Sequence, residues 1–140
     1  MKIRDSFWVN GHPNIKATHR STLEFTKDSE CTPKGDCILG VKATKSIADL
    51  NEELKRYLKM GGKVSVRIVC GDLVEEIVGF GSEKLVFSDS RSVVIRKSDY
   101  VDSRTLIIKA SKAARDISRE LVNCMKNPYS KALVEISSIP

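Results

Sequence analysis

The feature that most constrains the fold of this chain is an internal repeat. Residues 11–28 (GHPNIKATHRSTLEFTKD) align with residues 81–98 (GSEKLVFSDSRSVVIRKS) at a constant offset of 70, which sets Gly11 on Gly81 and Lys27 on Lys97. Further along, VKATKSIADLNEELKRYLKM matches IKASKAARDISRELVNCMKN at an offset of 67. Because several different segments match in the same order, we interpret the chain as two copies of one unit, about 1–70 and 71–140.

Each half predicts the same order of elements: strand, strand, strand, helix and strand. Apolar residues alternate with polar ones near 2–9 and 72–79, at 17–26 and 85–96, and at 37–42 and 105–109. Helical spacing follows, with starts expected at the hydroxyl residues Thr44 and Ser111. Final strands are expected from Lys63 and Lys131.

These elements predict a mainly β fold with α+β character, in one domain of 140 residues. Neither half can bury its sheet face alone, so we expect the halves to close about a pseudo-twofold axis as a β-barrel, which removes exposed sheet edges. The alternative is a two-layer arrangement with both helices on one face of a sheet.

Charge is unevenly placed along the chain. The net charge is +6, of which residues 1–70 contribute +5, from 13 Lys and Arg against 8 Asp and Glu. An excess of positive charge in one half attracts polyanions, whereas a scattered, solvated surface is the alternative interpretation.

The N-terminus and the cysteines indicate the cellular location of the protein and the redox state of its thiols. The start MKIRDSFWVN resembles neither a signal nor a transit peptide, and no apolar run is long enough to cross a membrane, so we expect a cytoplasmic protein. Cys31, Cys37, Cys70 and Cys124 lack the close spacing of zinc ligands, and we expect free thiols, no bound metal and no cofactor.

Two resemblances add to this interpretation. Over nearly its whole length the chain resembles an archaeal family of uncharacterised conserved domains, through GHPNIKATHRSTLEFTKD, TPKGDCILGV and RKSDY. That family implies no activity. Gly35-Asp36 before the strand CILGV also resembles the Gly-Asp turn of cradle-loop barrels, a class that includes DNA-binding regulators and riboflavin kinases. The second half has Ser103-Arg104 at this place, which leaves the barrel type open.

Polar differences between the two halves indicate where chemistry could lie. His12 and His19 align with Ser82 and Asp89, and Arg20 follows directly. His19 could act as a general base or contact a phosphate, with Arg20 as an anion ligand. The alternative is that both histidines hydrogen-bond the turn. Further cations surround the second strands in both halves: Lys16, Lys27, Lys34, Arg91, Arg96, Lys97 and Arg104.

The leading hypothesis is a binding module that recognises RNA or another phosphate-rich partner. Its binding residues would be His12, His19, Arg20, Lys27, Lys34, Arg96 and Lys97, gathered into a basic cradle. The alternative is an enzyme or binding domain for a small anionic metabolite, with His19 as acid or base and Asp36 orienting it. A subunit of a larger assembly is a third option, and the sequence leaves enzymatic activity and oligomeric state open.

Overall fold

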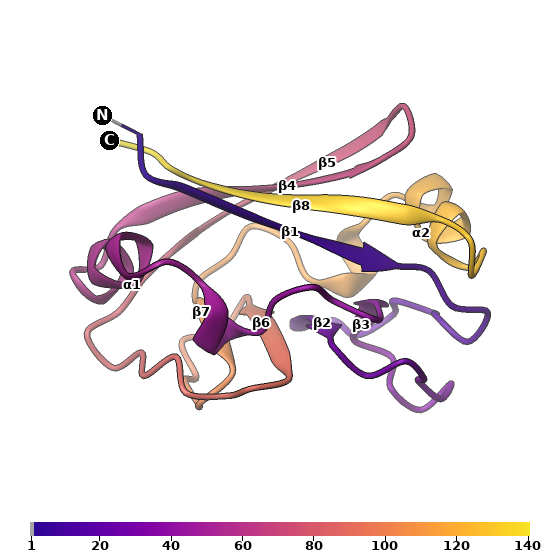
Figure 1. Ribbon diagram of the computed structural model, residues 1–140, viewed down its shortest axis with the longest axis horizontal. Coiled ribbons are helices and arrows are strands. Elements are labelled where there is room, and N and C mark those ends of the chain that lie inside the picture. The colour runs from indigo at the N-terminus through magenta and orange to yellow at the C-terminus, as the bar shows by residue number, and fades with distance from the viewer. Residues whose placement is uncertain (1) are drawn as a thin grey trace.

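The computed structural model of the protein describes residues 2–140 and shows a mainly β fold built from two four-stranded sheets and two short helices. Figure 1 shows one sheet along the upper side of the molecule, with the second sheet below it and both chain termini at one end. The N- and C-terminal strands lie next to each other in the upper sheet.

The upper sheet, here called sheet A, is antiparallel throughout. Its strand order is β1 (Arg4–Asn10), β8 (Lys131–Ser138), β4 (Lys63–Cys70) and β5 (Leu73–Phe80). Alternate residues of each strand point into the core, as the period of two in the sequence predicts. Phe7 of β1 meets Phe25 of the other sheet edge to face, with ring centroids 5.6 Å apart, so one core joins the two sheets.

The lower sheet, sheet B, mixes strand directions. Its order is β3 (Ile38–Gly40), β2 (Thr22–Thr26), β6 (Ser92–Arg96) and β7 (Thr105–Ile107). The central pair is antiparallel and the two outer pairs are parallel. Isolated bridges join Asn10 to Val41 and Phe80 to Ile108, and so link the edges of the two sheets. The strands are otherwise grouped into two separate sheets, so the closed barrel stays a prediction.

The order of elements is the same in the two halves, but several boundaries differ from those expected. The second strands are shorter than predicted because Ala17 and Phe87 adopt positive φ angles of 49° and 50°, which no regular strand contains. Neither Thr44 nor Ser111 begins a helix. Their hydroxyls instead accept hydrogen bonds from the N–H groups of β1 and β5, at Trp8 and Val78.

The helices begin several residues later. Short 3-10 turns, η1 (Ile47–Asp49) and η2 (Ala114–Asp116), precede α1 (Glu52–Lys59) and α2 (Arg119–Met125). Asn51 and Ser118 cap the two helices by accepting the N–H of Leu54 and of Leu121. No helix within residues 2–140 is both long and apolar enough to span a membrane.

The cysteines correct one expectation. Cys70, at the end of β4, forms a disulfide with Cys124 of α2, whereas Cys31 and Cys37 are free thiols. The prediction of four free thiols was therefore wrong. Sequence spacing could not reveal the pair, because its members lie 54 residues apart and meet only when α2 packs against sheet A.

Candidate functional site: a basic cluster at one end of sheet B

His19 lies just before β2, where its ring caps the backbone. Its Nδ1 accepts hydrogen bonds from the N–H groups of Ser21 (3.2 Å) and Thr22 (3.1 Å). A ring nitrogen that accepts from backbone N–H groups carries no proton, so the proton of the neutral ring resides on Nε2. No hydrogen bond within the described residues engages Nε2. His19 therefore fixes the turn with one nitrogen and can donate to a ligand with the other.

The loop that carries His19 packs against the second half of the chain. The carbonyl of His19 accepts the N–H of Arg115 (3.0 Å), and the carbonyl of Ser21 accepts the N–H of Lys97 (2.9 Å). The guanidinium of Arg119 donates to the carbonyl of Lys16 (3.4 Å) and to carbonyls of η2. These contacts gather one histidine and five cations, which we call the basic cluster: Lys16, His19, Arg20, Lys97, Arg115 and Arg119.

Most of the positive charge in the basic cluster faces solvent. Lys16, Arg20 and Arg115 are exposed, and none of the three forms an ion pair within residues 2–140. Lys97 pairs with Asp116 at 3.0 Å but stays 41% exposed. Hydrogen bonds from the N–H of Ala113 and from Lys97 lower the pKa of Asp116, so this carboxylate remains ionised at neutral pH.

The opposite end of β2 and β6 provides an internal comparison. There the ring of His19 is replaced by the carboxylate of Asp89, which caps Arg91 and Ser92 in the same way, at 3.0 and 2.7 Å. Lys27 repeats the pair of Lys97 by binding Asp49 at 2.7 Å. The remaining positions aligned with the cluster cations are Val86, Ser90, Ala48 and Glu52. The same local backbone therefore carries a cationic surface at one end and a neutral to acidic one at the other.

Four predicted binding residues lie outside the basic cluster, and His12 and Lys34 are two of them. Both ring nitrogens of His12 are used: Nδ1 accepts the N–H of Asn14 (3.0 Å) and Nε2 donates to Glu30 (2.7 Å). His12 lines a separate open hollow of about 610 Å³ together with Glu30 and Lys42. Lys34 is exposed in the turn before Gly35 and makes no ion pair among the described residues.

The side chains of Arg96 and Lys27 bind other residues of the protein. The side chain of Arg96 is 9% exposed, donates to Thr105 and Asp102, and stacks on Tyr100 with 4.8 Å between the guanidinium and the ring centroid. It is therefore not presented to a ligand. Lys27 lies with Asp49 at the opposite end of the sheet.

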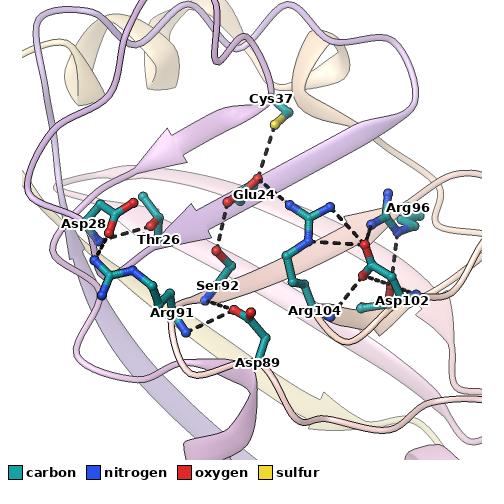
Figure 2. Close-up of polar contacts among 11 residues, drawn as sticks. Glu24, Thr26, Asp28, Cys37, Asp89, Arg91, Ser92, Arg96, Asp102 and Arg104 are labelled. Atoms are coloured by element: carbon teal, nitrogen blue, oxygen red, sulfur yellow. Dashed lines mark hydrogen bonds and ion pairs between the residues drawn. The ribbon is translucent and has the colours of Figure 1, made fainter.

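A polar network covers the outer side of sheet B, and Figure 2 shows the contacts among its members, which include Glu24, Arg104 and Asp102. Glu24 of β2 accepts hydrogen bonds from the Ser92 hydroxyl (2.9 Å) and the Cys37 thiol (3.5 Å), and lies 3.6 Å from Arg104. Burial, together with the nearby charge of Glu24, raises the pKa of Cys37 to about 12. The thiol is thus protonated at neutral pH and is a poor nucleophile.

Asp36 does not orient the ring of His19. Its backbone carbonyl accepts the N–H groups of Thr18 (2.8 Å) and His19 (3.1 Å), and no bond joins its carboxylate to the imidazole among the described residues. Two surface hollows are lined by other residues, one near His12 and one of about 580 Å³ on the outer face of sheet A. Within residues 2–140, no three His, Cys, Asp or Glu side chains are grouped to hold a metal ion.

Comparison with known proteins assigns the chain to a family. Residues 7–139 match the model of a domain of unknown function, DUF371. The chain belongs to this family. The chain is 44% identical over 118 residues to "Uncharacterized protein MJ0206" of Methanocaldococcus jannaschii, which covers 84% of this chain and 87% of that protein. The expected resemblance to an uncharacterised archaeal family is therefore confirmed, and the family brings no activity with it.

Arg115 and Arg119 of the basic cluster were not among the predicted binding residues. They belong to the second half, whereas His19 and Arg20 belong to the first, and only the packed structure brings them together. One sequence signal could have found them. The positions aligned with Arg115 and Arg119 are Ala48 and Glu52, so these two arginines are as specific to one half as the histidines are.

Proposed function

We propose that this protein binds RNA through the basic cluster, chiefly by contacts to phosphates. We also infer that its two halves are copies of one unit related by a pseudo-twofold axis. In support, β2 pairs with β6 so that Glu24 lies opposite Val94, its own equivalent at the offset of 70. The observation that carries the proposal is the difference between the two ends of this pair, one cationic and one neutral to acidic.

The chemistry of the cluster suits phosphate oxygens. Arg20 and Arg115 offer planar donor groups with no carboxylate partner in the described part of the chain, and His19 offers a neutral Nε2–H. Cations that neutralise phosphates release counterions, so affinity falls as salt rises. The basic cluster contains no aromatic ring on which a base could stack. We therefore expect binding with little sequence preference.

A salt titration tests the proposal. Fluorescence anisotropy of a labelled single-stranded RNA is measured at rising salt concentration. If Lys16, Arg20, Lys97 and Arg115 each contact one phosphate, the logarithm of the association constant should fall against the logarithm of salt concentration with a slope of roughly −3. Replacing Arg20 and Arg115 by their aligned residues, as Arg20→Ser with Arg115→Ala, should flatten that slope by roughly 1.5. Binding that is absent, or that does not respond to salt, contradicts the proposal.

The chain offers a matched control for the charge itself. Lys97→Ala and Lys27→Ala each remove a lysine paired with an aspartate of a 3-10 turn, so both alter the net charge and the local pairing equally. Only Lys97→Ala is expected to weaken RNA binding, because Lys27 lies at the acidic end. Equal losses in the two variants would show that overall charge, and not the basic cluster, attracts the RNA.

A further inference from the structure

The outer face of sheet A carries a continuous apolar row across all four strands. Strand register places Trp8 of β1 beside Leu133 of β8, Leu133 beside Val69 of β4, and Val69 beside Val74 of β5. Trp8 is 49% exposed and Val74 is 50% exposed. In Figure 1 no other element of the described chain lies over this face. The row is thus a contiguous apolar stripe rather than a scatter of single residues.

The repeat shows that the fold does not require this row to be apolar. At the offsets of 70 and 68, its members align with Val78, Ser65, Ser137 and Arg4. Those four residues form another row on the same face, four residues away along each strand. Three of the four equivalent positions, Ser65, Ser137 and Arg4, are therefore polar where the apolar row has Leu133, Val69 and Val74, so the apolar row needs an explanation other than folding.

We infer that the outer face of sheet A binds a second copy of this chain, with a twofold axis running along the apolar row. Such an axis sets each strand antiparallel on its own copy, and two sheets stack in this way about 10 Å apart. The apolar rows then cover each other. On the outer face, the residue two positions before the row on one copy faces the residue two positions after the row on the other copy.

Charge complementarity on β8 supports this occupant. On β8 the residues one step before and after Leu133 on the outer face are Lys131 and Glu135. The twofold axis brings Lys131 of each copy opposite Glu135 of the other, which gives two ion pairs. Lys131 is exposed and has no ion pair among the described residues, and Glu135 stays 39% exposed beside Arg67 at 3.5 Å. On β1 the same axis sets Asn10 opposite Ser6.

The patch is smaller than the roughly 20–30 residues a side of a standard interface, so the dimer is expected to depend on concentration. Analytical ultracentrifugation from about 1 μM to 1 mM measures this association directly. Trp8 is the single tryptophan of the chain, so its fluorescence should shift to shorter wavelength as the dimer forms. Leu133→Ser with Val69→Ser installs the residues of the aligned polar row and should abolish both signals while the circular dichroism spectrum is kept.

Charge exchange tests the geometry. Lys131→Glu alone and Glu135→Lys alone each place like charges together twice, and each should weaken self-association by roughly tenfold or more. An equimolar mixture of the two variants should recover dimers, because both contacts are then complementary. Lys63→Glu, on the same face but far from the row, serves as the control and should dimerise normally.

Three outcomes would overturn the inference. The first is a wild-type chain that stays monomeric up to 1 mM. The second is a pair of folded single variants that do not recover association on mixing. The third is a shift of the Trp8 fluorescence that needs RNA or another protein, because the face would then belong to that occupant.

Discussion

Arg96 donates a hydrogen bond from Nη2 to Oδ2 of Asp102 at 2.9 Å, where the arginine side chain is 9% exposed and the aspartate side chain 22%. Asp102 also accepts from the side chain and N–H of Arg104 and from the Thr105 hydroxyl. Burial alone would raise the pKa of Asp102. The bonds from Arg104 and the charge of Arg96 outweigh burial and lower this pKa to about 2.

The lowered pKa of Asp102 predicts a loss of stability in acid. A carboxylate with a depressed folded pKa stabilises the protein fully above its unfolded pKa near 3.8, and this stability is lost as pH falls towards 2. The contribution is about 2 kcal/mol at neutral pH. Urea unfolding of wild type and Asp102→Asn between pH 5 and 2 measures it. The difference between the two should shrink in acid, and a difference that is constant with pH contradicts the assignment.

Gly81 is predicted to be intolerant of a side chain. A Cβ at this position would lie 1.9 Å from the carbonyl oxygen of Leu58, at the end of α1, and backbone cannot move aside as a flexible side chain can. We expect Gly81→Ala to cost at least about 2 kcal/mol in the free energy of unfolding. Gly61→Ala is the control: it has open space and only a positive φ of 82°, so its cost should be near 1 kcal/mol. Equal costs would contradict this explanation.

The disulfide predicts a redox-dependent stability. Cys70 and Cys124 close a loop of 54 residues, and releasing this constraint should cost about 2–4 kcal/mol. A reductant should therefore lower the melting temperature of the wild type. The variant with both Cys70→Ala and Cys124→Ala should melt at the lower temperature and ignore the reductant. Thiol titration of the unreduced, denatured protein should find two reactive thiols, Cys31 and Cys37, and a count of four would contradict the pairing.

Local sequence patterns predicted the order and type of the elements, since a period of two or 3.6 depends on which side of each element is buried. They did not predict where elements end. At Thr44 and Ser111 a hydroxyl that suits a helix cap bonds a neighbouring strand instead. The partner of each hydroxyl depends on the positions of β1 and β5, and local sequence patterns do not predict those positions.

The candidate site was predictable only in part. His19, Arg20 and Lys97 were expected to share a surface, and the backbone brings them together. Arg96 was grouped with them because it precedes Lys97. Lys97 lies just beyond β6 and pairs with Asp116, whereas Asp102 and Thr105 bind the Arg96 side chain, which stacks on Tyr100. Distinguishing a buried cation from an exposed one required knowledge of its partners, which lie in the loop between β6 and β7.

His19 allows its structural and binding roles to be separated by substitution. His19→Asp installs the aligned residue of the second half. The new carboxylate should cap the N–H groups of Ser21 and Thr22, as Asp89 caps the equivalent groups in its own half. Stability should therefore be kept, whereas RNA binding should weaken by roughly tenfold because a carboxylate replaces a donor. His19→Ala leaves two N–H groups without an acceptor and should cost about 1 kcal/mol.

The reciprocal change completes this test. Asp89→His should keep the cap and stability, and Asp89→Ala should lose about 1 kcal/mol without weakening RNA binding, since Asp89 lies at the acidic end. Thermal melts and anisotropy titrations on the same samples compare the four variants. If His19→Asp binds RNA as tightly as the wild type, the Nε2–H makes no phosphate contact. The basic cluster would then act through Lys16, Arg20, Lys97 and Arg115 alone.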